Sequence, residues 1–166
     1  MSPTDPDTDP HPNLPHFVNL QLALDEARKC SPTRTAFGVR ALLVSPTGAI
    51  LSTGYSRELP GNIHAEQCAL DKLSASGAPL PDDTVLYTPM EPCSERLSGN
   101  LPCVDRIIAA GKIRTVYVGV KEPTTFIQEN VAERKLRENG IRYVHVSGLE
   151  KEILEAAFKG HEEREI

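Results

Sequence analysis

The sequence predicts an α/β protein, a three-layer α/β/α sandwich around a five-stranded mixed sheet. Two short apolar runs separated by Pro46-Thr47-Gly48 form a hairpin signal. Three more strand-like runs follow, and they alternate with helix-like segments. Such an order is typical of helices layered on a sheet. The fourth and fifth strands should be parallel, because the helix predicted between them allows a crossover connection.

The first predicted helix begins at Asn13, a residue suited to an N-cap, and ends near Cys30. Its apolar residues recur at helical spacing and are Phe17, Leu20, Leu24 and Ala27. Residues 1–15 contain five prolines, three aspartates and almost nothing apolar. Such a segment cannot bury enough surface to offset its ordering entropy, so we predict a disordered tail there.

The other elements follow in order along one domain, residues 16–160, with a short tail at 161–166. Strands are predicted at 39–45, 49–55, 84–88, 115–120 and 141–146, and helices at 63–76, 102–111, 128–139 and 149–160. Three of these helices end at glycines, namely Gly77, Gly111 and Gly140. Pro102 at the start of the third helix and Gly111 at its end match the preference for proline in the first turn and glycine after the last.

Composition narrows the class of protein. The chain has 166 residues, of which 39% are hydrophobic and 25% charged, as in an ordinary single globular domain. A formal net charge of −5 argues against a partner made of nucleic acid. No apolar run approaches about 18 residues, which argues against a membrane partner. The N-terminus also lacks a signal-peptide pattern, so we expect a cytoplasmic protein whose four cysteines are metal ligands or buried thiols.

Three short motifs suggest a metal site: His64-Ala65-Glu66, Pro92-Cys93 and Pro102-Cys103. Catalytic zinc commonly takes three imidazole or thiolate ligands and leaves a fourth position to water. Glu66 lies two residues beyond His64 at a helix start and so points elsewhere, which lets it approach the water without competing for the metal. The order matches the H-x-E…P-C-x-x-C signature of zinc-dependent deaminases.

The spacing of the cysteines departs from that signature, because nine residues rather than two separate Cys93 from Cys103. Cys93 should therefore end a strand or lie in a loop, and Cys103 should enter at a helix N-terminus, where the helix dipole favours a thiolate. The polar loop between them would then lie over the metal and contact substrate.

Each motif also has a structural explanation. His-x-Glu at a helix start can be coincidence or capping, and Pro-Cys pairs can mark turns with buried thiols. Cys68 lies four residues after His64 on the same helical face and is a rival ligand. We favour a buried thiol for Cys68, because its ligation would leave Cys93 or Cys103 unexplained.

With these motifs the chain resembles the cytidine deaminase superfamily, and within it the deaminases of riboflavin synthesis. The residues that carry the resemblance are Gly54-Tyr55, His64-Ala65-Glu66, Met90-Glu91-Pro92-Cys93-Ser94 and Pro102-Cys103. The long loop with Arg96, Ser98 and Gly99 is most similar to the fungal-type enzyme. The resemblance implies a cytidine deaminase-like fold, a Zn²⁺ cofactor and a homodimer. It also implies hydrolytic deamination of 2,5-diamino-6-ribitylamino-4(3H)-pyrimidinone 5′-phosphate to 5-amino-6-ribitylaminouracil 5′-phosphate.

The resemblance also implies roles for single residues. His64, Cys93 and Cys103 would hold zinc, and Glu66 would move protons. The implied substrate contacts are Asn62, Ser56, Arg96, Ser98, Glu122 and Thr124. Ser56 and Thr124 stand where the deaminase domain of the similar bifunctional bacterial riboflavin enzyme has His and Asn. Arg96, with Arg57 and Lys121, is a candidate for the phosphate, because arginine binds phosphate through two parallel hydrogen bonds. The alternative for each of the three is a solvated surface charge.

Two other functions fit parts of the sequence. The first is deamination of cytosine, cytidine or tRNA adenosine, although a tRNA enzyme should have a basic C-terminal helix, and residues 149–166 hold six glutamates against three basic residues. The second, from a different class, is an inactive zinc-stabilised binding module. Such a module typically loses the glutamate, which is present here as Glu66.

Overall fold

The computed structural model describes residues 15–27, 40–60, 63–96, 101–121 and 131–157. The strands are β1 (Arg40–Val44), β2 (Ile50–Tyr55), β3 (Thr84–Met90), β4 (Ile113–Val120) and β5 (Arg142–His145). The helices are α1 (Pro15–Ala27), α2 (Ala65–Ala75), α3 (Cys103–Ala110), α4 (Ala132–Glu138) and α5 (Glu150–Ala157). Both predicted tails lie outside the described residues, apart from Pro15, so the domain limits stay predictions.

The five strands form one mixed sheet in the order β2-β1-β3-β4-β5. β1 pairs antiparallel with β2 and with β3, whereas β3, β4 and β5 run parallel. The mixed sheet, the hairpin and the parallel fourth and fifth strands are therefore confirmed. The strands are longer than predicted where a neighbour pairs with them: β3 reaches Met90, opposite Val120, and β4 begins at Ile113, opposite Thr84.

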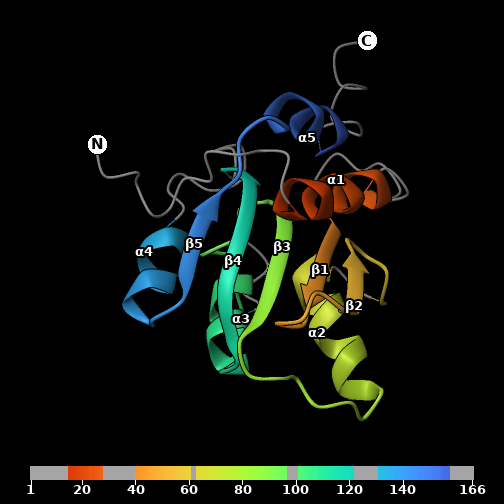
Figure 1. The fold of residues 1–166 in the computed structure, drawn as a ribbon, viewed down its shortest axis with the longest axis vertical. Coiled ribbons are helices and arrows are strands. Elements are labelled where there is room, and N and C mark those ends of the chain that lie inside the picture. Colours follow the sequence, from red (N-terminus) through yellow and green to blue (C-terminus); the bar gives the residue numbers. More distant parts are fainter. Residues whose placement is uncertain (1–14, 28–39, 61–62, 97–100, 122–130, 158–166) are drawn as a thin grey trace.

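Helices cover both faces of the sheet and make three layers (Figure 1). α2, α3 and α4 pack on one face, whose core includes Leu43, Leu86 and Val116. α1 and α5 pack on the other, around Leu42 and Tyr87. Successive residues of one strand thus enter different cores, as expected of strands buried on both sides. The predicted α/β/α sandwich is confirmed.

The α1/α5 face also contains a stack of three rings. The hydroxyl of Tyr87 lies 2.6 Å from His16 Nδ1, and the imidazole stacks on Tyr117 with ring centroids 4.1 Å apart. Burial raises the pKa of Tyr87, so its hydroxyl remains protonated. This contact fixes the start of α1 to the middle of the sheet, on the face opposite α2 and α3.

Gly54 lets helix α2 approach the backbone of β2. A Cβ at this position would lie 2.3 Å from the Ala65 carbonyl oxygen and 2.5 Å from the Ala69 amide nitrogen. Real side chains do not come so close to backbone atoms, so the helix can lie here only against glycine. The first turn of α2 is therefore placed by direct contact with the sheet.

Gly54→Ala should lower the free energy of unfolding by about 2–3 kcal/mol, because backbone atoms cannot yield as a flexible side chain does. Urea denaturation measures this loss. Ser52→Ala on the same strand removes only the hydrogen bond from its hydroxyl to the Ala69 carbonyl and should cost about 1 kcal/mol. An equal loss in the two variants would contradict the importance of the contact at Gly54.

Candidate active site

Three chain segments meet at the carboxyl end of β3. His64 is the N-cap of α2, and Cys103 is the first residue of α3. Cys93 lies in the irregular segment that follows β3. The prediction that Cys93 lies in a loop and that Cys103 enters at a helix N-terminus is therefore confirmed.

The donor atoms of these three residues are close together. His64 Nδ1 lies 3.5 Å from Cys93 Sγ and 3.5 Å from Cys103 Sγ, and one atom from each residue falls within 4.8 Å of the others. Around a tetrahedral zinc ion, sulfur at about 2.3 Å and nitrogen at about 2.0 Å are themselves about 3.5 Å apart. The donor set and its spacing fit zinc.

The two sulfurs are electrostatically unequal. The Cys103 thiol and the His64 ring lower the pKa of Cys93 to about 4, and the Cys103 amide donates to the Cys93 sulfur at 3.2 Å. The hydrogen bond to Cys93, together with burial, raises the pKa of Cys103 well above its ordinary value. A cation bound between the two sulfurs would allow both thiols to ionise, because two neighbouring buried thiolates would otherwise repel each other.

Glu66 lies beside this group, in the first turn of α2, and its side chain is buried. Burial raises the pKa of its carboxyl. The single hydroxyl proton of Thr88 on β3 is shared between two acceptors, Glu66 Oε1 at 3.1 Å and the Met90 carbonyl oxygen at 2.9 Å. The carboxylate is therefore fixed against the sheet at the edge of the metal-binding group.

Some of the other predicted residues can be placed. Cys68 is buried but is not part of the group around His64. Ser56 is buried directly after β2, and the amide of Arg57 donates to the carbonyl of Ile63, next to His64. Arg96 is buried three residues beyond Cys93.

The remaining predicted contacts are not tested. Lys121 is exposed and pairs with Glu133 at 4.0 Å. Asn62, Ser98, Glu122 and Thr124 lie outside the described residues.

The sequence reasoning assigned no role to three residues near the site: Thr88 and Tyr143, which it did not single out, and Glu91, which it named only as part of a motif. All three are buried, and the hydroxyl of Tyr143 donates to Glu91 Oε2 at 2.5 Å. Thr88 and Glu91 are polar residues in or just after an apolar strand, which is a weak signal of a buried partner. The partner itself is far away in the chain and leaves no pattern in the sequence.

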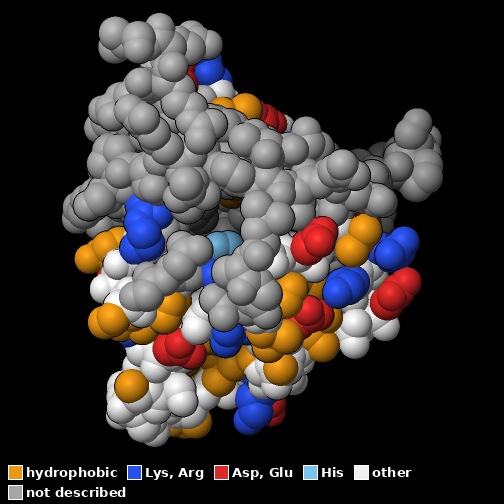
Figure 2. All heavy atoms as spheres, turned by 180° about the vertical axis from the view of Figure 1, so that it is seen from behind, with side chains coloured by type: hydrophobic (Ala, Val, Ile, Leu, Met, Phe, Trp, Pro, Cys, Tyr) orange, Lys and Arg blue, Asp and Glu red, His pale blue; other side chains and the backbone are white. Residues whose placement is uncertain are grey.

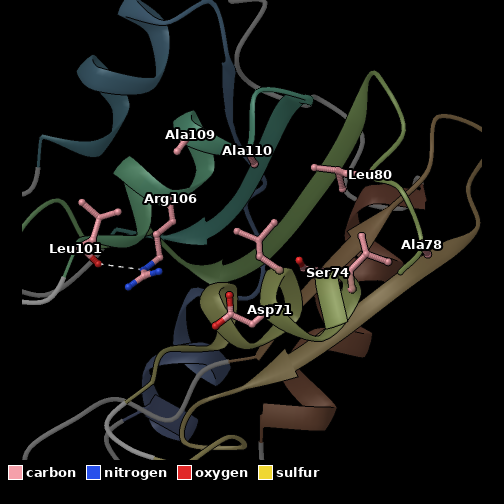
Figure 3. Close-up of a pocket in the computed structure, with 10 residues that line it drawn as sticks. Asp71, Ser74, Ala78, Leu80, Leu101, Arg106, Ala109 and Ala110 are labelled. Carbon is pink, nitrogen blue, oxygen red and sulfur yellow. Dashed lines mark hydrogen bonds between the residues drawn. The ribbon is translucent and has the colours of Figure 1, made fainter. Parts of the chain in front are cut away.

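A separate pocket of about 420 Å³ lies between α2 and α3 (Figure 3). Its lining includes Leu70, Ala109 and the exposed Leu101, whose carbonyl accepts a hydrogen bond from Arg106 Nε. None of the three candidate metal ligands lines it.

On the described part of the face in Figure 2, acidic and basic side chains are interspersed. Among the described helices, none has the length and apolar character needed to cross a bilayer.

Comparison with known proteins agrees with this geometry. The model of the "cytidine and deoxycytidylate deaminase zinc-binding region" matches residues 16–120. A diaminohydroxyphosphoribosylamino-pyrimidine deaminase of Schizosaccharomyces pombe is 41% identical over 150 residues, which cover 88% of this chain and 36% of that protein. The chain thus spans about a third of that relative. A cytosine deaminase of Candida albicans is 27% identical, covering 84% of this chain and 85% of that protein.

Solved structures add a likeness that extends over most of both chains. The Aspergillus oryzae Rib2 deaminase, as a C-terminal deletion mutant, superposes with a TM-score of 0.84 at 43% identity, covering 92% of this chain and 95% of that one. The same deletion mutant has also been solved in complex with DARIPP, with a TM-score of 0.82 at 43% identity, covering 92% of this chain and 94% of that one. From the matched region, the shared fold and the His-Cys-Cys group, the chain belongs to the cytidine and deoxycytidylate deaminase family and, within it, to the Rib2-type deaminases.

Proposed function

We propose that the chain is a zinc-dependent hydrolytic deaminase of riboflavin biosynthesis. It would convert 2,5-diamino-6-ribitylamino-4(3H)-pyrimidinone 5′-phosphate (DARIPP) and water to 5-amino-6-ribitylaminouracil 5′-phosphate and ammonia. The observation that carries the proposal is the group of His64, Cys93 and Cys103 with buried Glu66 beside it. The choice of substrate is supported by the 43% identical Aspergillus protein that binds DARIPP.

In this proposal His64, Cys93 and Cys103 hold the zinc ion through one ring nitrogen and two sulfurs. When bound, zinc supplies an open coordination position at which a water molecule has a pKa near neutrality. The Cys103 amide, which donates to Cys93 Sγ, orients that ligand and limits its movement. The chain's own contribution is to place this water beside Glu66.

Glu66 moves the protons. Its carboxylate takes one proton from the attacking water and gives it to the ring nitrogen next to C2. It then transfers the second proton to the amino group on C2, which leaves as ammonia while the C2 carbonyl forms. Burial raises the pKa of this carboxyl and so suits it to alternate between its two protonation states.

Thr88 should keep Glu66 in the orientation that this transfer needs. Thr88→Val preserves the shape of the side chain and removes the hydroxyl donor to Glu66. We expect kcat to fall about tenfold with KM unchanged, because hydrogen bonds to charged groups contribute about 1.5–3 kcal/mol. Steady-state kinetics measure both constants. Thr88→Ser, which retains the hydroxyl, should stay close to the unsubstituted protein, and equal kcat values for the two variants would contradict this role.

We also propose Arg96 as a phosphate contact, supported by its burial near Cys93 and by the bidentate geometry of guanidinium. Ser56 is a proposed contact to the base or ribityl chain, supported by its burial in the turn that contacts Ile63. Asn62, Ser98, Glu122 and Thr124 remain predicted substrate contacts. The homodimer also remains a prediction, and sedimentation velocity would test it.

The purified, zinc-loaded protein should release ammonia from DARIPP, and the product mass should rise by about one unit as NH is exchanged for O. Parallel reactions contain cytosine, cytidine, tRNA or the ribosylamino counterpart of DARIPP, in which a ribose replaces the ribityl chain. Turnover of one of these with none of DARIPP would overturn the proposed substrate. Zinc binding without ammonia release from any of them would instead support the binding module.

A further inference from the structure

The segment that carries Cys93 has no regular secondary structure, yet it is buried. Residues 91–94, which follow β3, are all buried and belong to neither a helix nor a strand. Irregular segments usually lie at the surface, because their backbone groups need partners that water supplies. The position of the Cys93 sulfur therefore depends on the particular contacts that this segment makes.

Backbone contacts fix the segment on several sides. The Glu91 amide donates to the carbonyl of Val120, the last residue of β4, at 2.9 Å. The carbonyl of Cys93 accepts from the amide of Val104, in the first turn of α3, at 3.1 Å. Ser94 Oγ accepts from the amide of Val131 at 3.0 Å. The sheet, α3 and the start of α4 therefore all contact it.

One side-chain contact ties the segment to β5. The hydroxyl of Tyr143 donates to Glu91 Oε2 at 2.5 Å, and the two side chains are 3% and 6% exposed. Burial and the Glu91 carboxylate raise the pKa of Tyr143, so the hydroxyl keeps its proton and donates. Short bonds of this kind, with a charged acceptor, are about twice as strong as neutral ones.

We propose that Tyr143 is a positioning residue for the metal centre: by holding Glu91 it fixes the Pro92–Cys93 segment and thus the Cys93 sulfur relative to His64 and Cys103. The inference rests on the proposed function, in which these three residues hold zinc. Tyr143 lies beyond residues 16–120, the part that the family model matches. Tyr143 therefore adds to the site a residue from β5, an edge strand of the sheet.

The test measures zinc affinity rather than activity alone. The dissociation constant is obtained by competition with a chromogenic chelator, and the absorption of the cobalt-substituted protein reports the geometry of its thiolate ligands. Tyr143→Phe should weaken zinc binding by up to about tenfold, the lower end of the effect of losing a hydrogen-bond partner of a metal ligand, because Tyr143 acts on Cys93 only through Glu91. It should also shift the cobalt spectrum.

A matched control separates positioning from stability. Tyr87→Phe removes another buried tyrosine hydroxyl with a hydrogen-bond partner, but on the α1/α5 face. Both variants should lower the thermal midpoint, and only Tyr143→Phe should change zinc affinity and the cobalt spectrum. Equal zinc affinity in Tyr143→Phe and Tyr87→Phe would overturn the inference, because the hydroxyl would then act only on stability.

Variants of Glu91 complete the test and serve if Tyr143→Phe does not fold. Glu91→Gln keeps an acceptor for Tyr143 and should retain zinc affinity within about threefold, whereas Glu91→Leu should lose about tenfold. In the Glu91→Leu background, Tyr143→Phe should have no further effect, because the two residues act through one bond. Additive losses would overturn the inference. Failure of the unsubstituted protein to bind zinc would reject the proposed function itself.

Discussion

Glu66→Gln should lower kcat for deamination by roughly 10²–10⁴-fold, which is the contribution of a positioned acid/base group. The amide has nearly the shape of the carboxylate, and its oxygen can still accept the hydrogen bond from Thr88. It cannot carry a proton between the attacking water and the leaving amine. Because Glu66 is not one of the three proposed ligands, the variant should retain zinc and fold normally. Ammonia release, metal analysis and thermal unfolding measure the three properties.

Glu58→Gln is the control for this substitution. Glu58 is another carboxylate, partly buried, that forms an ion pair with Lys72 near the other end of α2. Its replacement should leave kcat within a factor of about two, because a single ion pair near the surface contributes little. Undiminished ammonia release by Glu66→Gln would reject the role of Glu66 in proton transfer.

The second large effect is expected for Cys103→Ser. The variant should lose zinc affinity by more than about 100-fold, because it removes a proposed ligand. Substitutions of residues that only contact a ligand cost at most about 100-fold. Deamination should fall to background. The free energy of unfolding should no longer rise with added zinc, whereas the unsubstituted protein should gain about 2.7 kcal/mol at a free zinc concentration 100 times its dissociation constant. Chelator competition and denaturation with and without zinc measure these effects.

Cys68→Ser provides a matched comparison, because Cys68 is an equally buried thiol. Burial raises the pKa of Cys68, as expected of a thiol packed in the core, and the residue is not part of the candidate metal group. The substitution should lower stability but leave zinc affinity unchanged. If Cys68→Ser weakened zinc binding as much as Cys103→Ser does, the proposed ligand set would be wrong.

The layered fold could be predicted because its signals are local. Pro46-Thr47-Gly48 between two apolar runs indicates a hairpin, and glycines such as Gly111 mark helix ends; these patterns lie within a few residues of one another. The limits of β3 and β4 were less accurate, because each strand is extended by pairing with the other. Strand pairing is a contact between distant parts of the chain, and propensity in one segment does not contain it.

The candidate site also contains residues that a local sequence pattern indicates and residues that only contacts between distant parts of the chain reveal. His64, Glu66, Cys93 and Cys103 could be proposed as a group because zinc restricts its ligands to few residue types in a recognisable order. Thr88 and Tyr143 could not be proposed, since their partners lie 22 and 52 positions away in the chain. Threonine and tyrosine also occur in many strands without any role at a site. Only the folded geometry distinguishes these two from ordinary core residues.

The place of β5 in the sheet has a consequence for the motions of the protein. β5 is an outermost strand and pairs with β4 over four residue pairs. Outermost strands are among the first parts of a fold to fray. Because Tyr143 belongs to β5, each fraying event would release Glu91 and loosen a zinc ligand; by linkage, bound metal would suppress the fraying. Backbone amides of β5 should then exchange with solvent deuterium more slowly in the zinc-loaded protein than after chelation.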